Sequence, residues 1–239
     1  MKQLISQRPA RMSAFTLVEM LVVIAVIGIL AALLFPSFNA ITANSARKKA
    51  RNELEQIQAA IDRYHAQYSH YPPDNALAAY AVTDPRRYGF PQLFYELLGT
   101  TNTGPDFVTL DGRSRLQANQ LPTLFGASVS GFINCSRPGG DDATSGSGKN
   151  FLPGLLPAYY GTNNSGVYVL KTSAAWPKDR SPYFPTAGYP SELSPFFYNS
   201  SSPKHNPKTY DLWVDIVVRG KTNRISNWNP TYETVYMNY

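Results

Sequence analysis

The chain has 239 residues, of which 43% are hydrophobic, 13% aromatic and only 16% charged, a balance that excludes disorder along the whole chain. Its formal charge of +6 gives little support to a nucleic-acid partner. Lys2, Arg8 and Arg11 supply half of that charge, and the rest of the chain has 19 basic against 16 acidic residues. Cys135 is the only cysteine, so no internal disulfide can form.

The first predicted element is an apolar segment over residues 15–35, in which only Thr16 and Glu19 are polar. As a helix, 21 residues span ~30 Å, about one hydrocarbon core. The run is longer than the ~7–15 apolar residues of a cleaved secretory signal, and no A-x-A-like site closes it. The pattern therefore favours a membrane-spanning helix. A plain signal anchor would leave Glu19 unexplained, because a carboxylate in a bilayer is costly without a partner.

The stretch "SAFTLVEMLVVIAVIGILAALLFPSF" resembles the class III signal of type IV pilins and type II secretion pseudopilins. The resemblance implies that a prepilin peptidase cuts between Ala14 and Phe15 and that Phe15 is then N-methylated. It also implies that Glu19 acts in filament assembly and that Pro36 kinks the helix. This chain departs from the family at Ala14, where glycine is usual.

Elementary electrostatics suggests a partner for Glu19. Cleavage would create an α-amino cation at Phe15, and the first turn of a helix favours an anion through its macrodipole. In a filament, the carboxylate of one subunit could meet the amine of its neighbour. Such pairs set register better than they add net stability, so we expect Glu19 to fix the axial position of subunits.

The second half of the same predicted helix is amphipathic and ends before Pro72 and Pro73. Its apolar stripe recurs every three or four residues, at Ala46, Ala50, Leu54, Ile57, Ile61, Tyr64 and Tyr68. The same region also resembles the major pseudopilins. A basic cluster precedes the stripe, formed by Arg47, Lys48, Lys49 and Arg51. It is either a solvated helix face or a contact with anionic lipid headgroups, and it prevents the positive-inside rule from giving an orientation.

The rest of the chain predicts a head with few regular elements. Residues 89–99 predict a short helix stopped by glycine, and residues 166–170 a strand. Residues 100–165 are rich in Gly, Ser, Thr, Asn and Pro and are expected to form long loops, with a mobile surface loop over 137–150. Residues 176–207 are expected to be ordered but irregular.

The clearest β signal is a hairpin over residues 210–228. Tyr210 and the alternate residues after it form one apolar face, whereas Asp211, Trp213 and Asp215 lie on the other. Asp-Leu-Trp resembles a piece of the major pseudopilins, in which a calcium loop follows, but no such loop follows here. Calcium needs six to eight oxygen ligands, so Asp211 and Asp215 are weak candidates and solvent exposure or pairing with Arg219 or Arg224 is favoured.

No catalytic arrangement is visible. The stretch "ATSGSGKN" departs from a phosphate-binding loop at both ends, and Cys135 has no motif context for a nucleophile. We therefore predict a protein that is not an enzyme and that has no cofactor, with calcium as a weak possibility.

These observations predict an α+β, pilin-like fold, in which a long N-terminal helix packs against a small antiparallel sheet. The expected parts are a cleaved leader (1–14), a transmembrane half-helix (15–35), an amphipathic half-helix (36–70) and a periplasmic head (71–239). The expected location is the bacterial inner membrane, single-pass with the N-terminus cytoplasmic, and then a periplasmic pseudopilus.

The resemblance implies a structural subunit of a type II secretion pseudopilus. Its expected partners are copies of itself, other pseudopilins, the prepilin peptidase, the inner-membrane assembly platform and membrane lipid, with no nucleic acid. One alternative is a type IV pilus subunit, major or minor, for adhesion, motility or DNA uptake. The other is a membrane-anchored periplasmic protein of different function.

Overall fold

The computed structural model describes residues 15–74, 92–137, 147–163, 165–174 and 193–235, without the side chains of residues 33–41. The chain divides into two compact units, Met1–Thr42 and Ala43–Tyr239. The predicted leader and its last residue, Ala14, lie outside the described residues, as do most of the predicted surface loop over 137–150 and much of 176–207.

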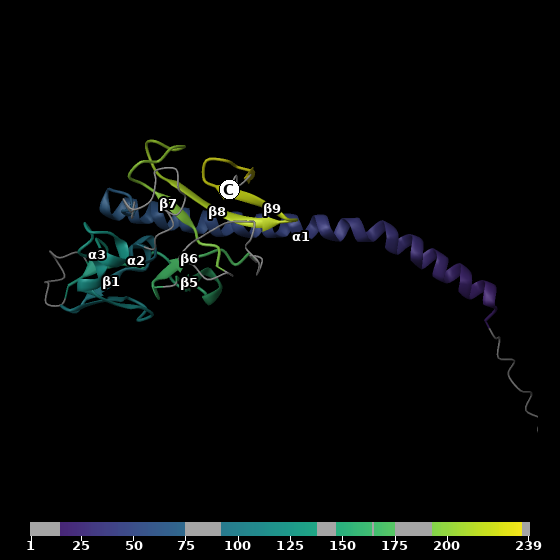
Figure 1. The fold of residues 1–239 in the computed structure, drawn as a ribbon, viewed down its shortest axis with the longest axis horizontal. Helices are drawn as coiled ribbons and strands as arrows, with labels where there is room; N and C mark the ends of the chain where they lie inside the picture. The colour runs from purple at the N-terminus through teal and green to yellow at the C-terminus, as the bar shows by residue number, and fades with distance from the viewer. Residues whose placement is uncertain (1–14, 75–91, 138–146, 164, 175–192, 236–239) are drawn as a thin grey trace, which may run out of the picture. The chain divides into compact units, whose positions relative to one another are not determined.

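Helix α1 (Leu17–Tyr68) forms the described part of the first unit and continues into the second (Figure 1). The prediction of one long helix is confirmed, because α1 runs without a break from Leu17 to Tyr68. It ends before Ser69, which adopts φ 60°, and the two prolines follow. Among the described side chains of the first unit, the large apolar ones are exposed, from 47% for Val23 to 80% for Leu17.

Among the described residues, no helix is apolar over a length sufficient to cross a bilayer.

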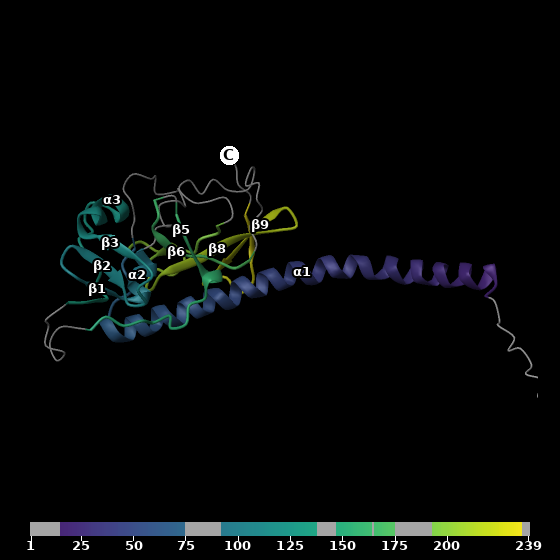
Figure 2. The same cartoon turned by 90° about the horizontal axis from the view of Figure 1, so that it is seen from below.

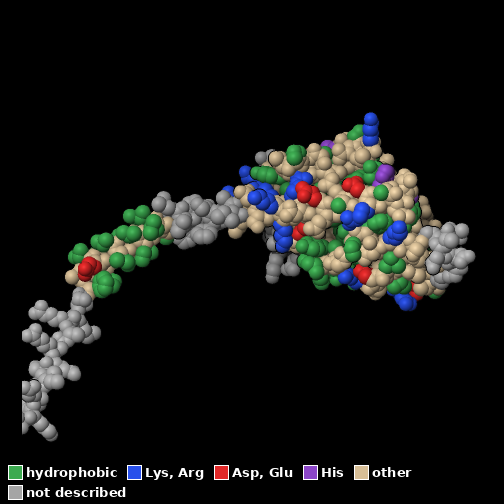
Figure 3. Space-filling view, turned by 180° about the vertical axis from the view of Figure 1, so that it is seen from behind, with side chains coloured by type: hydrophobic (Ala, Val, Ile, Leu, Met, Phe, Trp, Pro, Cys, Tyr) green, Lys and Arg blue, Asp and Glu red, His purple; other side chains and the backbone are tan. Residues whose placement is uncertain are grey.

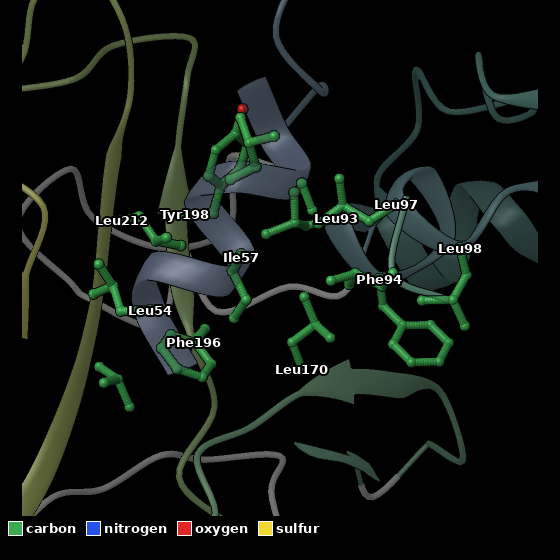
Figure 4. Packing of buried hydrophobic residues seen from close by; sticks show 14 of the residues in the cluster. Leu54, Ile57, Leu93, Phe94, Leu97, Leu98, Leu170, Phe196, Tyr198 and Leu212 are labelled. Atoms are coloured by element: carbon green, nitrogen blue, oxygen red, sulfur yellow. The ribbon is translucent and has the colours of Figure 1, made fainter. Parts of the chain in front are cut away.

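In the second unit, the predicted stripe of α1 is the centre of the core. Ala50, Leu54, Ile61 and Tyr64 are fully buried and Ile57 is 6% exposed. In Figure 4, Leu54 and Ile57 lie beside Leu212 and Phe196. Leu93 and Phe94 lie on the other side of Ile57. The stripe therefore serves as the platform that its spacing predicts, because one face of a 3.6-residue period is turned to the sheets.

A short helix and a four-stranded sheet follow. Helix α2 (Gln92–Leu98) is buried along its whole length and ends at Gly99, whose φ of +72° suits glycine, as predicted. The strands are β1 (Thr100–Asn102), β2 (Asp106–Thr109), β3 (Arg115–Gln117) and β4 (Cys135–Ser136), in the order β3-β2-β1-β4. The β1–β4 pair is parallel and the others are antiparallel. Between β3 and β4 lie η2 (Ala118–Gln120) and α3 (Leu121–Phe125).

The expectation of long loops over residues 100–165 is therefore wrong for much of residues 100–136, whereas the described residues between β4 and η3 contain no helix or strand. The strands there have two to four residues, too few to give a visible alternation in the sequence. An aromatic cluster holds them in place: the ring of Phe132 stacks on Tyr95 at 5.1 Å and meets Phe107 and Phe125 edge-on. Aromatic side chains bury large areas, so a few of them can organise a segment rich in polar residues.

A small two-stranded sheet comes next. After η3 (Pro157–Tyr159), β5 (Tyr160–Thr162) pairs with β6 (Tyr168–Leu170) in antiparallel register. Strand β6 confirms the strand predicted over residues 166–170. The views in Figures 1 and 2 agree that β5 and β6 lie between the first sheet and the C-terminal sheet.

The C-terminal sheet has the order β10-β9-β8-β7 and is antiparallel. Its strands are β7 (Phe197–Asn199), β8 (Asp211–Val218), β9 (Lys221–Ser226) and β10 (Glu233–Val235). The hairpin of β8 and β9 is confirmed, whereas β7 forms inside a segment expected to be irregular. Seven of the eight residues of β8 are buried, so the face of Asp211, Trp213 and Asp215 is covered as well.

Candidate functional site

The candidate site is the start of α1, where Thr16 and Glu19 form a reciprocal capping box. The backbone N–H of Thr16 donates to Glu19 Oε2 at 2.8 Å, and its hydroxyl donates to the same oxygen at 2.7 Å. In return, the backbone N–H of Glu19 donates to Thr16 Oγ1 at 3.2 Å. In Figure 3 the described helix of the first unit is covered by hydrophobic side chains, with one acidic group near its start.

This arrangement gives Glu19 a role within its own chain. The first four N–H groups of a helix have no intrahelical partner, and a Thr-x-x-Glu pair satisfies two of them. The residues "TLVE" match the capping-box pattern, but the role predicted for Glu19 involves only the α-amino group and the helix macrodipole. Thr16 is thus a site residue that the sequence reasoning missed.

The remaining predicted residues of this site are less fully described. Phe15 is 70% exposed, just before the helix, and Ala14 lies outside the described residues. Pro36 lies inside α1, but its side chain is not described, so the kink stays a prediction. Cleavage after Ala14 and methylation of Phe15 also stay predictions.

The first weak calcium candidate, Asp211, is surrounded by donors of its own loop. It is 2% exposed and accepts the backbone N–H groups of three successive residues: Lys204 at 2.7 Å, His205 at 3.0 Å and Asn206 at 2.9 Å. His205 Nδ1 lies 3.2 Å from the same carboxylate. Asp211 therefore holds the β7–β8 loop against the start of β8.

The second candidate, Asp215, is paired across the hairpin with Arg224. The pair is bidentate, with both N···O distances 2.9 Å, and Asp215 is 1% exposed. Pairing with Arg224 is one of the two alternatives that the sequence favours; the other, solvent exposure, holds for neither Asp215 nor Asp211. Among the described residues, no group of three His, Cys, Asp or Glu side chains could hold a metal ion. Calcium binding here stays a prediction of low weight.

A buried carboxylate that the sequence reasoning missed joins three elements of the second unit. Glu96 of α2 is fully buried and accepts from Tyr64 Oη of α1 at 3.0 Å. It also accepts the backbone N–H groups of Ile133 and Asn134, both at 2.9 Å. Burial raises the pKa of Glu96 above its ordinary value. The sequence does not indicate that Glu96 is buried. A single Glu in an otherwise apolar helix of seven residues is expected at a position that faces solvent.

Cys135 lines a hollow of about 490 Å³ together with Phe107, Phe132, Gln92 and Arg137. The thiol is half-buried, and burial raises its pKa. A raised pKa disfavours the thiolate, which is the reactive form. The hollow therefore offers no activated nucleophile at Cys135.

Comparison with known proteins agrees with the resemblance. The family model of the prokaryotic N-terminal methylation motif matches residues 10–35. Fimbrial protein EcpC of Eikenella corrodens is 38% identical over 74 residues, 31% of this chain and 48% of EcpC. Type II secretion system core protein G of Klebsiella pneumoniae is 30% identical over 86 residues, 34% of this chain and 61% of that protein. Type IV major pilin protein PilE of Neisseria gonorrhoeae is 36% identical over 67 residues, 28% and 40% of the two chains.

No solved structure gives a significant match. The chain spans between 40% and 61% of the length of these three relatives. The methylation motif, the long capped helix and the α+β fold define a pilin-like protein. Its relatives include both type IV pilins and type II secretion system core proteins G, so the similarity does not separate the two systems.

Proposed function

We propose that this protein is a structural, non-catalytic subunit of a type II secretion pseudopilus. The observation that carries the proposal is the methylation motif at residues 10–35, with Glu19 in the first turn of a helix that continues for 52 residues. The relatives named core protein G support secretion. The subunit is anchored in the inner membrane by residues 15–35, with its N-terminus cytoplasmic and its head periplasmic, until it enters the filament.

The first step is removal of the leader by the prepilin peptidase between Ala14 and Phe15. Both members of the capping box lie after this cut and remain in the mature chain. The new α-amino group on Phe15 is a cation, and methylation keeps it basic. The mature N-terminus therefore presents a cation next to the helix start.

The second step is assembly with copies of this chain and with other pseudopilins at the inner-membrane platform. Both Thr16 donors bond the same oxygen, Glu19 Oε2. Because an ionised carboxylate has about four acceptor positions, Glu19 can keep its cap while Oε1 accepts the α-amino group of a neighbouring subunit. The cap thus orients the carboxylate in advance and reduces the side-chain entropy lost when the intermolecular pair forms.

The test compares Glu19→Ala with Thr16→Ala in cells that assemble the filament. We expect Glu19→Ala to insert in the membrane normally but to abolish or scramble assembly, because the intermolecular pair is lost. Thr16→Ala removes the two hydrogen bonds of the Thr16 hydroxyl and keeps the carboxylate, so assembly should persist at a reduced level. Filament yield is measured by shearing filaments from the cells and detecting the subunit by immunoblot. Normal assembly of Glu19→Ala would contradict the proposal.

Mass spectrometry of the purified chain checks processing separately. A mature N-terminus at N-methyl-Phe15 supports the pathway, and retained Met1 rejects it. A plain membrane-anchored protein would keep its N-terminus intact.

A type IV pilus subunit is the second candidate, favoured by the similarity to PilE and EcpC. Deleting a retraction motor, if the organism has one, would change the number of filaments that contain this subunit only in the pilus case. Deleting the secretin of a secretion system would block export only in the pseudopilus case.

A further inference from the structure

An exposed apolar loop precedes β5 in the second unit. Residues 151–170 contain no charged residue, and within them the side chain of Leu156 is 57% exposed. The two residues that follow it, Pro157 and Ala158, are exposed as well. Neighbouring apolar side chains that stay exposed together are typical of interaction surfaces. We call Leu156, Pro157 and Ala158 the apolar tip.

The apolar tip is held in one conformation by its neighbours. The guanidinium of Arg113 donates twice to the carbonyl of Leu155, both at 3.2 Å, and lies 4.3 Å from the centre of the Tyr160 ring. The backbone N–H of Tyr159 donates to the carbonyl of Leu156 at 3.0 Å. A segment that is already ordered loses little conformational entropy when it binds a partner.

The hollow that contains Cys135 lies toward the other end of β2 from the apolar tip. Phe107 of β2 lines the hollow, whereas Arg113, which holds the tip, follows the far end of that strand. The volume of about 490 Å³ is within the ~300–1,000 Å³ of pockets that take a small molecule. Its lining includes two apolar side chains that solvent reaches, the half-buried Val129 and Ile133, which is 49% exposed. The lining also has polar residues: Asp74, Gln92, Asn102, Ser128, Ser130 and Arg137.

The wall of the hollow is also held in one conformation. The backbone N–H of Val129 donates to the carbonyl of Gly126 at 2.9 Å. The backbone N–H of Ile133 donates to the buried carboxylate of Glu96, also at 2.9 Å. In Figures 1 and 2, helix α3, which precedes this wall, lies apart from β5, which follows the apolar tip. The tip and the hollow are therefore two separate, preformed surfaces of one unit.

We propose that the apolar tip of one copy of this chain docks into the hollow of the next copy. Because the two surfaces differ and lie apart, each copy offers its tip to one neighbour and its hollow to another. Such heterologous contacts build open helical filaments when their rotation does not close a ring. The inference rests on the proposed function as a filament subunit, and it adds the surfaces through which neighbouring heads meet.

A second copy is the occupant that these residues favour. The apolar tip carries no charge, so neither anionic headgroups nor nucleic-acid phosphates gain from contact with it. Val129 and Ile133 give the tip an apolar surface to cover, and burial of Leu156 removes a large apolar side chain from water. The polar residues of the lining suit an interface, which combines apolar contacts with a polar rim. A different protein in the hollow is an outcome that the experiment separates.

The experiment uses the single native cysteine as a probe. Cys135 lines the hollow, so a second cysteine in the apolar tip, introduced as Ala158→Cys, would lie near Cys135 of the neighbouring copy. A short bis-maleimide is added to cells that assemble the filament, and to the purified full-length chain in detergent at several concentrations. We expect a ladder of dimers and higher multimers on a denaturing gel, and mass spectrometry should find residues 135 and 158 joined.

Two control variants show whether the link is specific. Ala158→Cys combined with Cys135→Ser should give no ladder. Lys208→Cys places a cysteine at an exposed position of the loop before β8 and should give far fewer multimers. A link between residues 135 and 158 of one copy would overturn the proposal, because the tip and the hollow would then be neighbours. A link from the hollow to a different protein alone would also overturn it.

The association of heads gives a second measurement, on chains that keep Cys135 as the only cysteine. Filled hollows should protect Cys135 from N-ethylmaleimide, so its alkylation should slow as the concentration of the chain in detergent rises. We expect Leu156→Ala to raise the concentration that gives half protection about tenfold, because less apolar surface is buried. Lys208→Ala should leave it unchanged. Equal protection of Leu156→Ala and the wild type would contradict the role of the tip.

Processing and filament yield of the same samples separate this proposal from the proposed function. Filaments with N-methyl-Phe15 and the link between residues 135 and 158 support both. Filaments without the link overturn the docking of the tip and leave the function as a subunit standing. A concentration-dependent ladder from a chain that retains Met1 and forms no filament supports the docking and rejects the function. A chain with neither a ladder nor filaments overturns both.

Discussion

Among the carboxylates that accept hydrogen bonds from backbone amides, Glu19, Glu96 and Asp211 each fix a different piece of structure. Glu19 caps the start of α1, Asp211 holds the loop before β8, and Glu96 ties α2 to residues 133–134. Backbone N–H groups must find partners wherever they are removed from water. A carboxylate is an efficient solution because it accepts several of them at once.

The loop held by Asp211 provides the first stability test. Asp211→Asn places an amide N–H₂ where backbone donors converge, so we expect the free energy of unfolding to fall by about 2–3 kcal/mol. Urea unfolding of the full chain in detergent measures it. Asp106→Asn is a matched control, because its partner Arg115 is 69% exposed and such pairs contribute at most about 1 kcal/mol. Equal losses for the two variants would contradict the role given to Asp211.

At the scale of elements, the contact between α1 and the C-terminal hairpin combines an apolar stripe with two arginine ties. The stripe contributes apolar burial, since Leu54 of α1 and Leu212 of β8 are both fully buried. The arginines fix the orientation of the hairpin on the helix, because a guanidinium presents several donors in a fixed plane. Together they align β9 with α1 at Asn223 and Ser226.

Arg51 is the tie with the most hydrogen bonds, three in all, to the carbonyls of Ser226, Asn229 and Thr231. We expect Arg51→Ala to lower the free energy of unfolding by about 2 kcal/mol and to speed amide exchange between β9 and β10. Arg51→Lys keeps the charge but cannot reach three carbonyls at once, so it should restore only part of the loss.

Lys49→Ala is the control for Arg51, since it changes an exposed cation on the same helix. It should change the free energy of unfolding by less than about 0.5 kcal/mol. A result in which Lys49→Ala matched Arg51→Ala would assign the effect to charge or helix propensity rather than to the tie.

At the scale of the whole molecule, Glu96 links the first sheet, α2 and α1 inside the second unit. Asn134 extends this network: its side-chain amide donates to the carbonyls of Glu96 and Lys149, and its Oδ1 accepts from Tyr68 at 2.7 Å. The polar network therefore runs from Tyr64 to Lys149, which are 85 residues apart in the sequence (149 − 64). The ionisation of Glu96 should therefore change the stability of the second unit as a whole.

The stability of the second unit should depend on pH through Glu96. Burial raises its pKa in the folded chain above the ordinary value of 4.5, so the folded state binds more protons than the unfolded state above that pH. Glu96 thus contributes stability below pH 4.5 that is lost as pH rises through the raised pKa, by at most ~1.4 kcal/mol per pH unit.

Urea unfolding of Glu96→Gln between acidic and mildly alkaline pH tests this sign. The wild-type advantage over Glu96→Gln should shrink as pH rises, because glutamine does not titrate. Glu55→Gln removes an equal charge at an exposed position of α1 and should run parallel to the wild type. A constant gap between wild type and Glu96→Gln would refute the assignment.

Features that depend on the local order of residues along the chain can be predicted from the sequence. The period of the stripe from Ala46 to Tyr68, the prolines at 72 and 73, the glycine at 99 and the alternation in β8 each predict an element that the structure contains. The motif around Glu19 predicts the family for the same reason, since its residues are contiguous.

Features that depend on contacts between distant residues appear only in the folded chain. The strands between Thr100 and Ser136 are too short to have a pattern of their own, and they are held by aromatic rings and by the buried Glu96. Likewise, Arg47 and Arg51 of α1 meet residues of β9 and of the segment after it only in the folded chain. Burial and long-range hydrogen bonds are properties of the folded chain, so the sequence order does not display them.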